Sequence, residues 1–162
     1  MRLFLFYLIL LSFQGFVGAL IAPLPGPDFF LLMALTPIRR LNAWQMVLIA
    51  YGIGLLQDLI GHGIFGMHAF ALAVGIFMAL LIKGQFSQGF FAQMLLILTA
   101  LLGKWMAMTA IIYWLNPKIA SDSFQGIMNI LPYEVAFTLV VGIFILPWSE
   151  SLMQKVFLAR GH

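Results

Sequence analysis

Long apolar stretches separated by short turns constrain this chain more than any other feature of its sequence. A helix that crosses the hydrocarbon core of a bilayer needs about 20 consecutive, mostly apolar residues. We expect six such helices, over residues 3–22, 27–38, 41–59, 66–82, 90–115 and 131–148. The connections between them are too short for a soluble domain. We therefore predict an all-α, polytopic membrane protein, a compact bundle in which residues 1–162 form a single integral membrane domain.

Composition supports this class. The chain is 64% hydrophobic and 8% charged, and its mean hydropathy is +1.09, above the range of soluble domains. Arg2 followed by an apolar run also fits a signal peptide, but a run of about 20 residues favours a retained helix. The second stretch has only about ten apolar residues before Pro37, which is short for a full crossing and indicates a tilted, buried or partly re-entrant segment.

Basic residues predict the orientation, because cytoplasmic loops retain Lys and Arg. With the N-terminus inside, six of the eight basic residues fall on the cytoplasmic side: Arg2, Arg39, Arg40, Lys83, Lys155 and Arg160. If the second stretch did not cross, Arg39 and Arg40 would lie opposite Arg2. We therefore predict six spans with both ends in the cytoplasm.

Charged side chains fall inside the predicted third, fifth and sixth spans, where contact with lipid is costly. They are Asp58, Lys104 and Glu134. Lys104 is expected to pair with Asp58 or with Glu134 across the bundle. A proton or ion pathway is one interpretation, but a buried ion pair that fixes helix register is the favoured one.

The stretch between the third and fourth spans combines an aspartate and two histidines with glycines. Asp58, His62 and His68 invite a metal site, but the glycines beside His62 make a fixed ligand geometry doubtful, so a turn is the better interpretation. Gly61 and Gly66 suit a tight turn. Other small residues, Gly52, Gly54 and Ala69, suit close packing of helices or binding of a partner.

The sequence lacks the patterns of several classes of site. It contains no cysteine, which excludes disulfides and thiolate chemistry. No catalytic or nucleotide-binding motif is present, and Asp28 and Asp122 are expected in outer loops, so Asp58 has no evident aspartate partner for intramembrane proteolysis. Basic residues are scattered at segment ends, which argues against nucleic acid binding. We expect a non-enzymatic protein with no cofactor and no metal.

The stretch GIGLLQDLIGHGIFGMHAFAL, residues 52–72, resembles the signature of the rod shape-determining protein MreD family. The shared pattern has glycines on the third span, a Gly-Leu-Leu-x-Asp-Leu core, a glycine-bearing turn and a small-residue start to the fourth span. The short second segment PDFFLLMAL is also similar to that family. The matching positions are Gly52, Gly54, Leu55, Leu56, Asp58, Leu59, Gly61, Gly66, Ala69 and Phe70.

The resemblance implies a scaffold of the cell-elongation machinery in the bacterial cytoplasmic (inner) membrane. Such a scaffold binds membrane-anchored MreC and helps to link MreB filaments to the RodA glycosyltransferase and its class B penicillin-binding protein. Its architecture resembles that of the substrate-binding subunits of energy-coupling factor transporters. A vitamin-capturing subunit of that kind is the rival interpretation, in which Asp58, His62, His68, Lys104 and Glu134 would line an outward pocket.

Overall fold

The computed structural model describes residues 8, 9, 11, 12, 26–61, 64–84, 89–115 and 117–158, with side chains in the last range for 125–149 and 151. This part of the chain is helical and contains no strand, which confirms the all-α class. Its five labelled helices are α2 (Phe29–Leu35), α3 (Ala43–Ile60), α4 (Met67–Lys83), α5 (Phe90–Leu115) and α6 (Pro117–Leu158).

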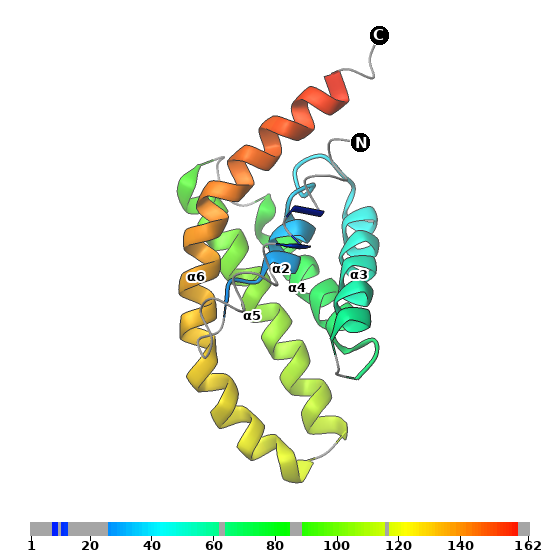
Figure 1. Ribbon diagram of the computed structural model, residues 1–162, viewed down its shortest axis with the longest axis vertical. Coiled ribbons are helices and arrows are strands. Elements are labelled where there is room, and N and C mark those ends of the chain that lie inside the picture. Colours follow the sequence, from blue (N-terminus) through cyan, green and yellow to red (C-terminus); the bar gives the residue numbers. More distant parts are fainter. Residues whose placement is uncertain are drawn as a thin grey trace.

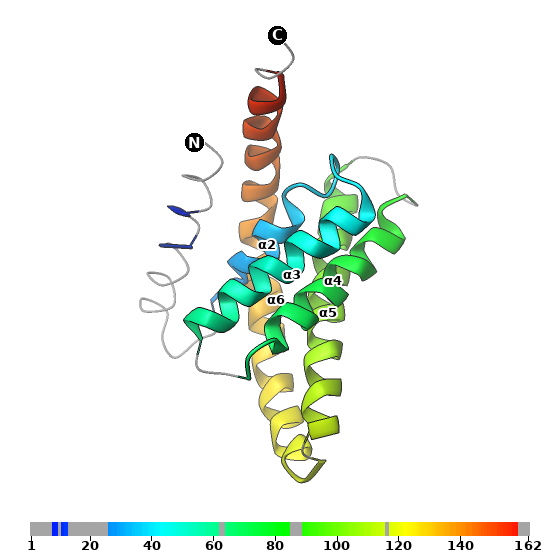
Figure 2. The same ribbon diagram turned by 90° about the vertical axis from the view of Figure 1, so that its right-hand side faces the viewer.

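Within the described residues, three stretches are long and apolar enough to cross a membrane, namely α3, α5 and Gln125–Ser149 of α6. The apolar helix α4 is shorter, at 17 residues. Along the chain, α3 packs on α4, α4 on α5, and α5 on α6 (Figure 1). The halves of α5 and α6 that meet near residue 116 project beyond α3 and α4 in both views (Figure 2).

Helix α2 differs from its prediction as a span. It has only seven residues, or roughly 10 Å of helix, so it is too short to cross a bilayer. All seven side chains are buried, and α2 contacts each of the other four helices. Asp28 caps its start, and Pro37 follows its C-cap, where proline opposes further helix. The six-span arrangement, whose orientation depended on this crossing, is therefore not supported.

Helix α6 also differs from the prediction, which ended the fifth span at 115 and began the sixth at 131. The helix starts at Pro117 and continues for 42 residues, with Pro132 and Pro147 inside it. Proline suits the first helical position, and neighbouring helices can compensate for prolines inside a membrane helix. The predicted first span, 3–22, lies mostly outside the described residues, although residues 8, 9, 11 and 12 are helical.

The core forms around α2. Leu31, Leu32 and Leu35 are almost completely buried there, against side chains from α3, α4 and α5. The fully buried partners include Met46, Leu72, Ile76, Ile97 and Leu101. A short, wholly buried helix at the centre places its N-cap residue, Asp28, in the interior of the bundle.

Candidate functional site

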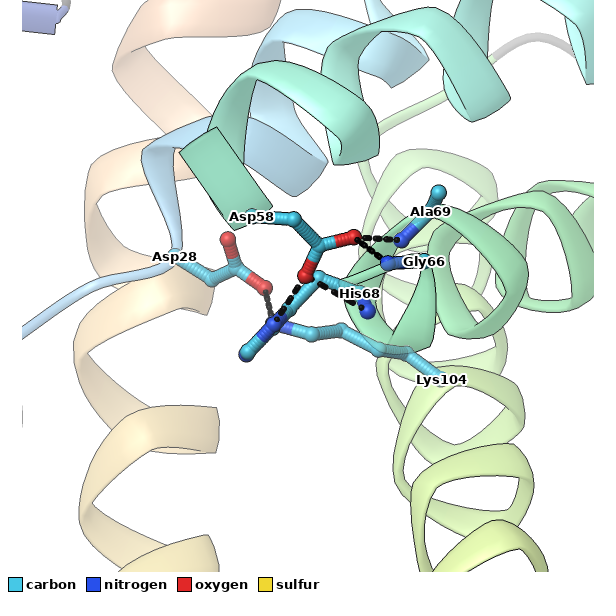
Figure 3. Close-up of polar contacts among 6 residues, drawn as sticks. All are labelled: Asp28, Asp58, Gly66, His68, Ala69 and Lys104. Atoms are coloured by element: carbon cyan, nitrogen blue, oxygen red, sulfur yellow. Dashed lines mark hydrogen bonds and ion pairs between the residues drawn. The ribbon is translucent and has the colours of Figure 1, made fainter. Parts of the chain in front are cut away.

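The first polar cluster is the corner between α3 and α4, built around Asp58. The carboxylate accepts hydrogen bonds from the backbone N–H groups of Gly66 (2.9 Å), His68 (3.1 Å) and Ala69 (3.2 Å). The Nδ1–H of His68 adds a fourth hydrogen bond at 2.8 Å (Figure 3). The first N–H groups of a helix have no partner inside that helix, and the helix dipole favours negative charge there. Asp58 therefore caps α4 from the preceding helix.

Glycine is needed at two positions of this corner. Gly66, the N-cap of α4, has φ of 91°, a left-handed conformation that side chains with a Cβ rarely adopt. A Cβ on Gly54 would lie 2.3 Å from Cα of Ala69, so α3 and α4 touch through their backbones. The predicted turn and the predicted close packing of Gly54 against a neighbouring helix are both present.

The two other glycines of the motif have different surroundings. Gly61 is the C-cap of α3, and its N–H donates to the carbonyl oxygen of Gln57 at 2.9 Å. Gly52 is exposed, and a Cβ there would meet no atom within 4 Å. Gly52 therefore makes no close helix contact within the described part of the fold.

Replacing Asp58 by alanine is expected to destabilise the folded protein by about 2 kcal/mol, because several helix-end N–H groups lose their acceptor. Thermal unfolding in mild detergent measures this change. Asp58→Asn is the matched control: it keeps one acceptor oxygen and should lose less. Unchanged stability and unchanged partner assembly in Asp58→Ala would refute the role of Asp58 at the corner.

The second polar cluster, here called the ion triad, consists of Asp28, Lys104 and Glu134. The Nζ of Lys104 contacts Oδ2 of Asp28 directly and lies 3.9 Å from Oε1 of Glu134. The side chains of Asp28, Lys104 and Glu134 are 2%, 5% and 11% exposed, so all three charges are held away from solvent. The triad joins the start of α2 to α5 and α6.

Hydrogen bonds fix Asp28 within the triad. Its Oδ1 accepts from the N–H of Leu31 at 3.0 Å, which caps α2, and its own N–H donates to Oγ1 of Thr138 at 2.9 Å. Thr138 lies one helical turn after Glu134, on the same face of α6. Asp28 therefore binds α6 through its backbone and α5 through its carboxylate.

The ion triad corrects the prediction for Asp28 and decides between those for Lys104. Asp28 lies in the interior, whereas the predicted topology placed it in an outer loop. Of the two predicted partners of Lys104, Glu134 lies within ion-pair distance and Asp58 is engaged instead with the start of α4, while the direct partner is Asp28. An aspartate directly before an apolar run is a helix N-cap signal, and it pointed to the start of α2 at this position.

The indole of Trp105 adds a polar group beside the triad. Its Nε1 is a buried atom, and its N–H faces the carboxyl group of Glu134. The same side chain lines a groove of about 460 Å³ between α5 and α6. The other lining residues are Leu102, Met106, Thr109, Ala110, Tyr113, Ile127, Met128 and Leu131.

Two of the three residues of the metal hypothesis, Asp58 and His68, are in direct contact, with His68 Nδ1 at 2.8 Å from Asp58 Oδ1. The third, His62, lies outside the described residues. Among the described side chains, no group of three or more His, Cys, Asp or Glu residues is arranged to hold a metal ion. The two polar clusters are therefore candidates for structural, partner-binding or proton-binding roles.

Comparison with known proteins finds no counterpart: no family model, curated protein or solved structure matches this chain. The function proposed below is therefore based on the α3–α4 corner and the ion triad.

Proposed function

We propose that this protein is a non-enzymatic, multi-pass scaffold of the bacterial inner membrane, of the MreD type. In this role it binds MreC and helps to link MreB to the RodA and class B penicillin-binding protein synthase, and so maintains cell shape. Lipid and these proteins would be its partners.

The observation that carries the proposal is that the residues resembling the MreD signature form one structural unit. Asp58 caps α4, Gly66 makes the turn, and Gly54 packs on Ala69. Each of these positions has a specific physical requirement: a carboxylate, a left-handed backbone or the absence of a side chain. The matching residues therefore form one local structure. Similarity at these positions supports the MreD type more strongly than a shared abundance of Leu and Gly would.

The outward face of α3 supports a role in binding helices. Large apolar side chains are exposed along it, including Trp44, Leu48, Leu56 and Leu59. Gly52 lies on this helix with open space at its Cα. In a bilayer, small residues allow a partner helix to approach closely, and the apolar neighbours would pack around it.

The test is affinity purification of the tagged protein from its native host in mild detergent, with mass spectrometry of the proteins recovered. We expect MreC and the elongation synthase in the eluate of the tagged strain and their absence from an untagged control. Recovery of an ATPase pair with a transmembrane coupling subunit, and not of MreC, would contradict the scaffold proposal.

The ion triad favours a second candidate, the vitamin-binding subunit of an energy-coupling factor transporter. Buried charges next to an indole N–H are the kind of polar groups that orient a small ligand. The scaffold is preferred because Lys104 and Asp28 already satisfy each other, and Asp58 and His68 do the same at the corner. Mass spectrometry of small molecules released from the purified protein tests this candidate, which predicts a bound vitamin.

A further inference from the structure

The ion triad contains more acidic than basic groups. Asp28 and Glu134 share one ammonium, that of Lys104. Lys104 is the one charged residue in the sequence of α5, the sequence of α2 contains none, and no charged residue occurs between Arg2 and Asp28. With all three groups ionised, the triad has one uncompensated negative charge. An uncompensated charge among apolar helices is costly, and a bound proton removes it.

The contacts identify Glu134 as the group that takes this proton. Asp28 uses Oδ2 for the ammonium of Lys104 and Oδ1 for the N–H of Leu31, so both of its oxygens act as acceptors. Glu134 is 3.9 Å from the same ammonium, within ion-pair range but beyond hydrogen-bond length. Protonation of Glu134 therefore leaves the direct Lys104–Asp28 contact intact.

The position of Glu134 in α6 connects this proton to helix packing. Glu134 lies two residues after Pro132, which has no N–H to donate to the preceding turn, so α6 is less constrained there. Leu131, just before Pro132, lines the groove between α5 and α6 together with Trp105, the neighbour of Glu134. A change of charge at Glu134 thus occurs close to a weakened point of α6 and beside Trp105, one of the residues that line the groove.

We propose that Glu134 is a proton-binding site, and that loss of its proton loosens the packing of α6 on α5 at Pro132. Ionised Glu134 requires water, which reaches it when the groove between the two helices opens. The inference is independent of the scaffold proposal, because it depends only on the triad and the groove.

Infrared difference spectroscopy of the detergent-solubilised protein across a pH series tests the site directly. We expect the carbonyl stretch of a buried protonated carboxylic acid in the wild type, its loss as the pH rises, and its absence in Glu134→Gln. Asp58→Asn is the control that removes the buried carboxyl group of the α3–α4 corner, and it should keep the band. Absence of the band in the wild type, or its persistence in Glu134→Gln, would overturn the proposal.

Thermal unfolding gives a second measurement with a defined sign. The folded protein holds a proton that an exposed glutamic acid has already lost, so folding stability falls as the pH rises. We expect the Tm of the wild type to fall by several degrees between about pH 5 and about pH 8, and that of Glu134→Gln to change much less. His68→Gln, which removes the imidazole next to Asp58, should keep the wild-type dependence. An equal fall in wild type and Glu134→Gln would contradict the proposal.

The absence of cysteine from the chain allows the opening to be measured by spin labels. Met106 and Met128 line opposite sides of the groove and are exposed, so a Met106→Cys, Met128→Cys pair can be labelled without touching the core. We expect the distance between the labels to increase at high pH, and adding Glu134→Gln should abolish the increase. A distance that is the same at every pH would show that the proton does not control the groove.

Discussion

Replacing Lys104 by methionine is expected to destabilise the folded protein by about 3–5 kcal/mol. The ammonium of Lys104 is the only positive charge in the ion triad, and its removal leaves the buried carboxylate of Asp28 without a counter-charge. The loss also weakens the connection between α2, α5 and α6. Thermal or denaturant-induced unfolding in detergent measures the effect.

A charge-free triad provides the control. In the triple variant Lys104→Met, Asp28→Asn, Glu134→Gln, no charge remains, and asparagine can still accept the hydrogen bond of the Leu31 N–H. Replacing a whole buried ion pair is often neutral, whereas removing one partner is not. We expect the triple variant to recover most of the lost stability. If it is as unstable as Lys104→Met, the uncompensated charge is not the cause.

Replacing Gly54 by alanine is the second large effect, with an expected loss of about 3 kcal/mol. The new Cβ would lie 2.3 Å from Cα and 2.7 Å from the backbone nitrogen of Ala69, and 2.7 Å from the carbonyl oxygen of His68. Overpacking usually costs about 1–3 kcal/mol. The upper end applies here because backbone cannot move aside as a flexible side chain can, and because the shift also disturbs the hydrogen bond from Ala69 to Asp58.

Gly52→Ala is the matched control, two residues away on the same helix. A Cβ at Gly52 meets nothing within 4 Å, and alanine favours helix over glycine, so unchanged or slightly higher stability is expected. Unfolding of both variants under the same conditions gives the comparison. Equal losses at the two positions would mean that glycine in α3 matters for the helix itself and not for its contact with α4.

The sequence predicted those helices whose ends have clear local signals. Residues 41–59, 66–82 and 90–115 correspond to α3, α4 and α5 within one or two residues. Gly61 forms the C-cap of α3, and Gly66 turns the chain into α4 with a left-handed backbone conformation that favours glycine. The role of Asp58 at this corner was also predictable, because it lies close in sequence to the N–H groups that it caps.

The pairing of Lys104 was not predictable in the same way. Asp28 and Lys104 are 76 residues apart, and Asp28 and Thr138 are 110 apart, so no local pattern connects them. The extent of α6 was also missed. The predicted sixth span, 131–148, contains Pro132 and Pro147, but the helix extends beyond both of its limits, through residues 117–130 and 149–158. An apolar run marks only the part of a helix that can lie in the bilayer core, and the helix itself can be longer.

The sequence by itself determined that this protein is helical and apolar, where α3, α4 and α5 begin and end, and that a glycine-rich corner joins α3 to α4. These properties follow from hydropathy, helix-end residues and the conformational freedom of glycine, all of which act over a few residues. Only the tertiary structure decided that α2 is a short buried helix and that its N-cap, Asp28, meets Lys104, Glu134 and Thr138. That arrangement depends on the packing of helices that are distant in sequence. The packing decides which buried charges become partners, and no local sequence pattern shows it.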